Sequence, residues 1–569
     1  MKGTTKYDLG WGTLSFLGVL LLFFGAFLFY PISFMLKEAF WQQGTFTLQY
    51  FSLLLQSPLQ RQSLFNSFLL ASLTTLLTTL LTMPLAQVMT RFNFRGKVLL
   101  SGLLLAPMIM PPFVGAIGLK QLLAKFGSLN LLLMQLGILE PGQPIDWLGQ
   151  GGFWGIVLLQ VMNLYPIMFL NVSAAMANID PALREAAQNL GAGGWRLFRT
   201  VTLPLILPGY FAGAVIVFIW AFTDLGTPLI FGFSRVVPVQ IFDSITEINT
   251  NPMGYALVVF VLLLTLALFL VSKRFLAGKR YEMIARGHVA GAEVQATWRQ
   301  TIGLWLLIGG IIAFALLPHA TVMVQSVSER WFFSVLPEAW TGAFYAEIFR
   351  HSLTVSSIRN SLFYSSLSAL VDLVLGVIIA WLLTRRRIPG AAFLDGLAML
   401  PLALPGLVLA FGYVAGFDFK ISWLNPRQNP TLLLIISYSV RRLPYIVRSA
   451  YAGFQQTSIT LEEASANLGA TPFRTLRKIT LPLVMAHLIA GTILAFSFAM
   501  LEVSDSLILA MREEFFPITK MIWQIMGRVD PSAPSVACAL GVVGIVILTA
   551  SLMAASKLLG KKMGQLFRV

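Results

Sequence analysis

Long apolar runs, separated by short polar, basic or Gly-rich stretches, dominate the chain from residue 11 to residue 557. Each run reaches roughly the 20 residues that an α-helix needs to cross a bilayer. Runs of this length favour membrane-spanning helices over strands. The pattern predicts twelve spans, at 11–36, 64–90, 97–119, 152–176, 207–232 and 252–275 in the first half, and at 301–325, 361–384, 391–415, 431–453, 484–511 and 534–557 in the second.

The composition indicates the same class of protein. Hydrophobic residues make up 57% of the chain and charged residues 11%, whereas a soluble globular protein has about 25% charged residues. The sequence therefore predicts an all-α polytopic membrane protein, whose first run is too long for a cleavable signal. One cysteine, Cys538, excludes an internal disulfide, and the four scattered histidines show no metal-ligand spacing.

The distribution of basic residues orients the spans. Of the 40 Lys and Arg residues, 24 fall in loops and tails on the side of the N-terminus, 13 fall in loops on the other side, and three lie within the tenth span. Basic loops gather on the cytoplasmic face of a membrane protein. We therefore expect both termini to be cytoplasmic. The net charge of +16 then reflects this bias, and we expect the partner to be the lipid bilayer and no nucleic acid.

The two halves of the chain repeat one another at matched positions. Asn66-Ser67 and the Pro107/Pro111 pair recur 294 residues later, as Asn360-Ser361 and Pro401/Pro405. Beyond these the offset is 278 residues, which joins Pro166 to Pro444, Glu185 to Glu463, Gly191 to Gly469, Pro204 to Pro482 and Asp224 to Glu502. Six spans per half make the halves parallel repeats. The predicted domains are a first repeat at 1–275, a basic cytoplasmic linker at 276–300 and a second repeat at 301–569.

A charged stretch interrupts each half at the same place. It reads EAAQNLGAGGWRLFRTVTLPL from Glu185 and EASANLGATPFRTLRKITLPL from Glu463, within loops at 180–204 and 458–482 that face the cytoplasm. Asp180-Pro181 predicts a helix start, Thr460 and Glu463 have capping-box spacing, and Gly191 and Gly469 suit the left-handed residue that ends a helix. We expect a second short helix near 195–201, after which Leu203-Pro204 turns the chain back into the membrane.

These loops resemble the cytoplasmic signature loop of permease subunits of binding-protein-dependent ABC importers. The Asn-Ser and Pro pairs resemble the same family, and the duplication resembles its fused permeases for ferric iron, thiamine or aminoethylphosphonate. The resemblance implies a type I importer fold in the bacterial cytoplasmic membrane, two copies of an ATP-binding subunit and a periplasmic or extracellular solute-binding protein. It implies that the ATPase-coupling residues are Glu185, Ala186, Ala187, Gly191, Glu463, Ala464, Ser465 and Gly469. The chain has no phosphate-binding G-x-x-x-x-G-K-[ST] motif, so we expect ATP and Mg to be bound by the partner.

Ionisable residues at membrane depth mark a pathway or a buried pair. Asp224 precedes Gly226, Thr227 and Pro228, where we expect the helix to break and to line a cavity. Its repeat partner Glu502, with Asp505 nearby, and the arginines of the tenth span complete the predicted pathway set, which is Asp224, Glu502, Asp505, Arg441 and Arg442. The structural alternative is that each acidic residue caps a helix fragment or forms hydrogen bonds to neighbouring helices.

The two adjacent arginines, Arg441 and Arg442, break the symmetry of the repeat, because Asn163 and Leu164 take their places in the first half. They could hold an anionic substrate group, neutralise Asp224 and Glu502, or form a structural pair with Asp372. The structural pair with Asp372 is favoured over the binding of an anionic substrate. Acidic residues suit a cation such as ferric iron, thiamine or a polyamine, whereas two buried arginines suit an anion such as a phosphonate.

Three classes of function remain open at this stage. An importer permease explains the repeat, the buried charges and the matched loops together. A twelve-span secondary transporter explains the repeat and the charges but not the loops. An intramembrane enzyme would require a nucleophile and base or a metal site, and the sequence shows no such set, so we assign no catalytic and no metal-binding residue.

The predicted orientation can be tested by labelling introduced cysteines. Cysteines at Ala192 and Thr471 should react with an impermeant thiol reagent only from the cytoplasmic side. Cysteines at Gln143 and Gln428 should react only from outside, because the basic bias places these loops on opposite faces. Reversed labelling at either pair would show that the spans are miscounted.

Overall fold

The computed structural model describes residues 10–42, 44–109, 111–248, 250–277, 293–418 and 421–559. Most of the predicted linker at 276–300 lies outside these residues, so the structure does not test the predicted domain boundaries there. The described residues are almost entirely helical, with three two-stranded pairings: β1 (Trp41–Gln42) with β2 (Thr45–Phe46), β3 (Phe92–Asn93) with β4 (Val294–Gln295), and β5 (Ser328–Arg330) with β6 (Ala339–Trp340).

The first repeat is built around three packed helices, α4, α8 and α11. The other helices of the repeat pack around this bundle or lie in the loops at its two ends. The helices are α1 (Trp11–Phe24), α2 (Tyr30–Phe40), α3 (Gln49–Gln56), α4 (Pro58–Arg91), α5 (Lys97–Leu103), α6 (Pro112–Leu123), α7 (Ser128–Gln135), α8 (Phe153–Ala177), α9 (Pro181–Asn189), α10 (Gly194–Leu197), α11 (Leu203–Phe222), α12 (Gly226–Phe231), α13 (Val237–Ser244) and α14 (Met253–Ala277).

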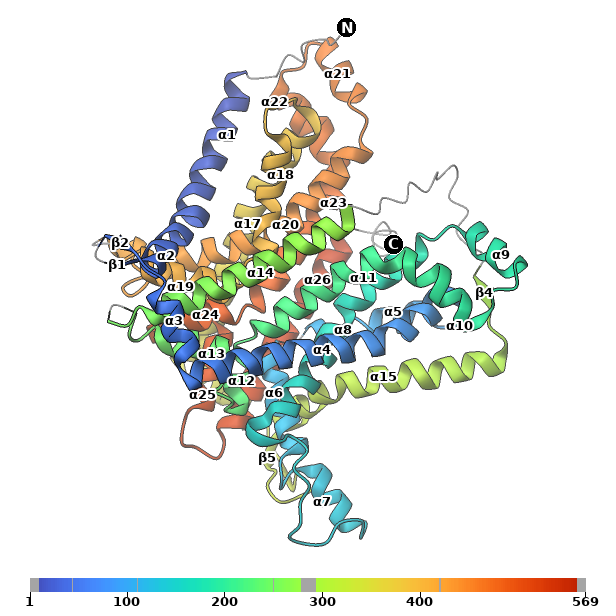
Figure 1. Ribbon diagram of the computed structural model, residues 1–569, viewed down its shortest axis with the longest axis vertical. Helices are drawn as coiled ribbons and strands as arrows, with labels where there is room; N and C mark the ends of the chain where they lie inside the picture. The colour runs from blue at the N-terminus through green and yellow to red at the C-terminus, as the bar shows by residue number, and fades with distance from the viewer. Residues whose placement is uncertain are drawn as a thin grey trace.

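The second repeat has the same plan, with a bundle of α17, α20 and α23. Its colours run from yellow-green to red in Figure 1. The helices are α15 (Trp298–Gln325), α16 (Ala343–Arg350), α17 (Ser352–Arg385), α18 (Ala391–Met399), α19 (Gly406–Gly416), α20 (Thr431–Gln456), α21 (Thr460–Asn467), α22 (Pro472–Thr475), α23 (Leu481–Met500), α24 (Ser504–Leu509), α25 (Ile518–Met526) and α26 (Ala533–Leu559).

Nine helices among the described residues are long and apolar enough to cross a membrane, or up to eleven if each of two bent pairs is one span. The bends are 95° and 97° and follow the Pro107/Pro111 and Pro401/Pro405 pairs, because a proline inside a helix removes one hydrogen bond and clashes with the preceding turn. The one remaining expected span, the tenth, corresponds to α20, which has 26 residues. Its three arginines make it too polar to be counted among the apolar membrane-spanning helices.

The spans predicted at 64–90 and 361–384, whose starts lie near the two Asn-Ser pairs, begin earlier in the structure, so both pairs lie inside α4 and α17. Ser67 Oγ accepts a hydrogen bond of 2.8 Å from the backbone N–H of Val237, and Ser361 Oγ accepts one of 2.8 Å from Ile518. Val237 and Ile518 are the first residues of α13 and α25, whose N–H groups have no partner within their own helix. Each serine therefore satisfies the start of a short helix that lies against the bundle.

The first span of each repeat packs against the other repeat. Helix α2 contacts α19, and α15 contacts α6. Tyr30 Oη donates to the carbonyl of Gly416 at 2.8 Å, and Tyr413 Oη donates to the carbonyl of Phe27 at 2.7 Å. At the α15–α6 contact, a Cβ on Gly118 would lie 2.6 Å from the carbonyl oxygen of Pro318, so only glycine permits this approach. The two repeats are thus clasped together at two places.

Candidate functional site

Two helices break at membrane depth, one in each repeat. Helix α11 ends at Phe222 and α12 begins at Gly226, as the sequence predicted, and α23 ends at Met500 before α24 begins at Ser504. Asp224 and Glu502 lie in these breaks. Asp224 Oδ1 accepts from Thr227 N at 3.3 Å, and Glu502 Oε1 accepts from Asp505 N at 3.3 Å. Each carboxylate therefore caps the fragment that follows it.

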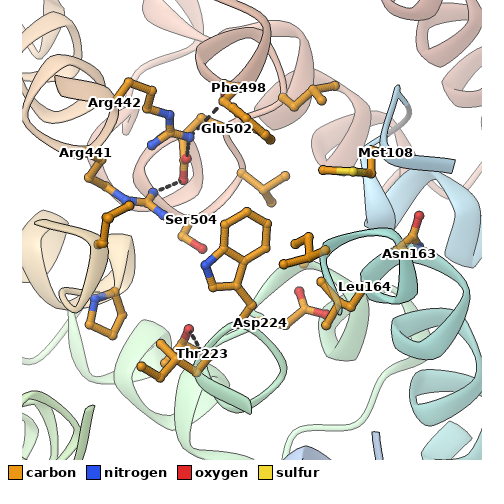
Figure 2. Close-up of a pocket in the computed structure, with 18 of the residues that line it drawn as sticks. Met108, Asn163, Leu164, Thr223, Asp224, Arg441, Arg442, Phe498, Glu502 and Ser504 are labelled. Atoms are coloured by element: carbon orange, nitrogen blue, oxygen red, sulfur yellow. Dashed lines mark hydrogen bonds and ion pairs between the residues drawn. The ribbon is translucent and has the colours of Figure 1, made fainter. Parts of the chain in front are cut away.

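Both breaks open on one cavity of about 210 Å³ between the repeats (Figure 2). The repeats contribute equivalent positions to its wall. These are Pro107 and Pro401, Met108 and Leu402, Asn163 and Arg441, Leu164 and Arg442, Ile167 and Tyr445, Trp220 and Phe498, Thr223 and Leu501, Asp224 and Glu502, and Gly226 and Ser504. A cavity at the interface of two repeats, lined by broken helices and holding charged side chains in a largely apolar wall, is the arrangement that repeat-built transporters use for solutes.

The second repeat supplies a buried charge cluster to this wall. Arg441 Nη1 lies 2.6 Å from Glu502 Oε1 and 3.3 Å from Asp505 Oδ2, and Arg442 pairs with the other oxygen of Glu502. Arg442 also donates to the carbonyl of Phe498 at 2.9 Å. Two arginines and two carboxylates give this cluster no formal net charge. Figure 2 shows Arg441 and Arg442 both reaching toward Glu502.

The structure corrects one expectation about these arginines. They do not pair with Asp372. That carboxylate is fully buried and accepts a hydrogen bond of 2.6 Å from Ser439 Oγ, and its other oxygen has no hydrogen-bond partner among the described residues. Asp505, which was placed in the pathway, is also fully buried and is absent from the cavity wall. It accepts from Ser437 Oγ at 2.9 Å and holds Arg441 from behind.

A glycine makes room for this cluster. Gly406 begins α19, and a Cβ at this position would overlap the Arg441 guanidinium and lie 2.5 Å from Asp505 Oδ1. Gly396 on the preceding helix has open space around it. The bend after the second Pro pair therefore brings backbone against Arg441 at a distance that only glycine allows.

Asp224 is in a different state from Glu502. It accepts from Gln160 Nε2 at 3.2 Å, and no described residue forms an ion pair with it. Gln160 in turn accepts from Thr74 Oγ1 at 2.8 Å, so a chain of neutral groups holds the carboxylate. The cavity therefore has an unpaired acidic group on one wall and a neutralised cluster on the other.

Sequence reasoning named the charged residues of the cavity and missed its neutral ones. Gln160, Trp220, Tyr445 and Phe498 line the wall. The rings of Trp220 and Phe498 meet edge to face, with centroids 6.4 Å apart, although they belong to different repeats. The 278-residue offset relates these two positions, so applying the repeat to aromatic residues would have found them.

The cytoplasmic loops have matching local structure. Gly191 and Gly469 both have φ of 82°, the left-handed conformation that the sequence predicted. Asp180 caps α9 by accepting from Ala182 N at 2.9 Å. Two details were wrong. Thr460 is the first residue of α21 and not its cap, and Leu203-Pro204 makes no turn, because residues Gly194–Phe222 form one continuous helix through a π-turn.

Six of the predicted coupling residues lie on the two short helices α9 and α21, and Gly191 and Gly469 follow the ends of these helices. The two helices project from the body at separate points (Figure 1). Glu185, Ala186, Glu463 and Ala464 are exposed, Ala187 is half-buried and Ser465 is buried. Ser465 Oγ forms a hydrogen bond of 2.9 Å with Thr475 Oγ1, which ties α21 to the next helix. The second short helix and the following span therefore move with the loop as one unit.

Both loops expose large apolar side chains at equivalent positions. The exposed fractions are 43% and 46% for Leu183 and Leu461, 86% and 89% for Leu190 and Leu468, and 72% and 71% for Trp195 and Phe473. Exposed apolar groups repeated on two copies of a polar loop indicate two equivalent protein contacts.

The chain matches the family model described as "Binding-protein-dependent transport system inner membrane component" twice, at residues 79–281 and 372–565. It is 27% identical over 508 residues to a putative ferric transport system permease protein FbpB 1 of Haemophilus influenzae, covering 85% of this chain and 76% of that protein. It is 26% identical over 549 residues to the ferric transport system permease protein FbpB of Actinobacillus pleuropneumoniae, covering 94% and 76%. A bacterial ABC transporter that imports alginate aligns with a TM-score of 0.39 and 20% identity, over 48% of this chain and 96% of that chain.

The contrast between the two carboxylates predicts opposite effects on stability. Glu502→Gln leaves Arg442, which is 6% exposed, without its counter-charge, and breaking a buried pair in this way costs about 3–5 kcal/mol. Asp224→Asn removes a charge that has no cationic partner, so the thermal unfolding midpoint should stay the same or rise. Unfolding of the two purified variants in one detergent measures both effects. A larger loss for Asp224→Asn would contradict the assignment.

Proposed function

Since the chain belongs to the family of binding-protein-dependent transport system inner membrane components, we propose that the cavity between its repeats is the translocation route of an ATP-driven importer. The two cytoplasmic loops would couple this route to two copies of a separate ATP-binding subunit. A solute-binding protein would deliver the substrate from outside. Both termini would lie in the cytoplasm, and ATP and Mg would be bound by the partner.

The unpaired carboxylate of Asp224 in the cavity wall is the observation that carries the substrate class. Glu502 and Asp505 already neutralise Arg441 and Arg442, so the arginines are not free to hold an anion. A carboxylate without a counter-ion at membrane depth favours a cation. This supports ferric iron, the solute in the names of the two relatives, or another cation such as thiamine or a polyamine, over aminoethylphosphonate.

The matched loops favour an importer permease over a secondary transporter. A secondary transporter draws its energy from an ion gradient across the membrane and gains nothing from two equivalent cytoplasmic protein contacts. Here each loop ends its first helix in the same left-handed glycine, exposes three equivalent apolar side chains and continues directly into a span that ends at the cavity. A push on α9 or α21 is thereby transmitted along α11 or α23 to the break that holds Asp224 or Glu502.

The proposed route predicts a loss of flux without a loss of assembly. Asp224→Asn should lower ferric iron uptake into proteoliposomes at least about tenfold, the effect of about 1.4 kcal/mol. The variant should still bind the ATP-binding subunit and hydrolyse ATP, because Asp224 lies far from the loops. Gln143→Asn, in the outer loop, serves as a control for an amide-sized change. Unchanged uptake by Asp224→Asn would refute the proposed route.

The proposed coupling predicts a loss of assembly without a loss of folding. Leu190→Glu combined with Leu468→Glu places charge where each loop would bury an exposed leucine in its partner. Burying a leucine contributes about 1.5–3 kcal/mol, so co-purification of the ATP-binding subunit should fall at least about tenfold. Gln188→Glu, which adds one negative charge at an exposed position of α9 close to Leu190, should retain the partner. Retention by the double variant would argue against docking at these loops.

A further inference from the structure

The second repeat locks its cytoplasmic loop to the bundle with a built-in ion pair. Arg385, the last residue of α17, lies 3.0 Å from Glu462 Oε1 on α21, and both side chains are largely buried, with 8% and 18% exposed. Arg385 also donates to the carbonyl of Thr457 at 2.8 Å, and its guanidinium lies over the ring of Phe454 at 5.5 Å. The loop helix and the end of the span are thereby held as one body.

The first repeat has two cations at the same two positions. The offsets of 294 and 278 residues carry Arg385 to Arg91 and Glu462 to Arg184. Arg91 is the last residue of α4, as Arg385 is the last of α17. Neither Arg91 nor Arg184 forms an ion pair with any acidic side chain in the described part of the chain. Arg184 Nε is buried without a hydrogen-bond partner there.

The electrostatics of this site call for a negative charge. Burial lowers the pKa of Arg184 from its ordinary value, and the nearby charge of Arg91 lowers that pKa further. Both effects disfavour the cation, yet an arginine stays protonated in proteins. A half-buried guanidinium beside a second one is stabilised when an anion lies between them.

The direction in which Arg184 faces indicates where that anion comes from. On α9, only Pro181, Arg184 and Ala187 are partly buried, and the other residues of the helix are exposed. Arg184 therefore lies on the face of α9 turned toward the membrane domain, away from the exposed face available to an ATP-binding subunit. Helix α5 follows the end of α4, where Arg91 lies, and exposes Val98 and Leu99 at 84% and 58%. Large exposed apolar side chains are expected of a surface in contact with lipid.

We propose that Arg91 and Arg184 bind the phosphate of an anionic lipid headgroup, which takes the place that Glu462 fills in the second repeat. Basic sites at the cytoplasmic ends of spans suit such headgroups, and paired guanidinium groups bind phosphate with several charge-assisted hydrogen bonds. The first loop would then be anchored by the membrane and the second by the protein itself. Coupling at the first loop would depend on the anionic lipid content of the bilayer.

The test compares nanodiscs of phosphatidylcholine alone with nanodiscs that also contain phosphatidylglycerol, using the full chain. Wild-type protein should unfold about 2 °C or more higher with phosphatidylglycerol, since a ligand that binds only the folded state raises the midpoint. Arg184→Glu recreates the ion pair of the second repeat, so its midpoint should be raised in phosphatidylcholine and no longer respond to phosphatidylglycerol. Arg199→Glu, an exposed change of equal charge in the same loop, should keep the wild-type response.

Several results would overturn the proposal. They are a wild-type midpoint that ignores phosphatidylglycerol, an Arg184→Glu variant that keeps the response, or an Arg199→Glu variant that loses it. A shift produced equally by inorganic phosphate in phosphatidylcholine would assign the site to a free anion. Arg184→Gln supplies the same test if Arg184→Glu fails to fold, and it should also lose the response. Loss of ATP-binding subunit from Arg184→Gln in both lipids would assign the site to that subunit instead.

Discussion

An ionised side chain at membrane depth is tolerated only when opposite charge and hydrogen bonds surround it, and the centre of this protein is arranged around that requirement. Glu502 lies between Arg441 and Arg442, and Asp505 supports Arg441 from behind. Gly406 leaves room for the guanidinium, and the bend of 97° before it brings α19 to that place. The charges on the second repeat's side of the cavity are therefore neutralised, whereas Asp224 on the opposite wall accepts hydrogen bonds but has no ion-pair partner among the described residues.

The internal repeat gives the chain two copies of the cavity wall and of the cytoplasmic loop, and the two copies differ in how their charges are paired. In the cavity, the second copy became a neutral cluster and the first kept a single carboxylate. At the cytoplasmic loops, the second copy has an internal ion pair and the first has two arginines. In both places the second repeat supplies its own counter-charge and the first does not. The asymmetry therefore concentrates in the first repeat the positions that need something from outside the chain.

Much of this architecture could be predicted from the sequence. Long apolar runs specify spans, and the repeat locates the breaks at Asp224 and Glu502 because two independent copies carry the same signal. The family resemblance is confirmed by the two matched segments. Partner choice among buried charges was harder. Pairing of Arg441 and Arg442 with Asp372 was favoured over substrate binding, whereas the helix break at 501–503 brings Glu502 to them, which was the other alternative. Tertiary contacts of this kind leave no periodic signal in the chain. For the same reason the sequence did not reveal that Ser67 and Ser361 bind the first N–H groups of α13 and α25.

The clasp between the repeats has a consequence for how the molecule can change shape. Because α2 lies on α19 and α15 lies on α6, each half carries an arm that belongs to the other. Neither half can swing outward as an independent lobe without dragging that arm along. Opening the central cavity is then a rocking of two interlocked bodies about their shared arms. Two separate polypeptides with the same sequences would have the same clasp, so the covalent fusion fixes the pairing of unequal halves and not the motion itself.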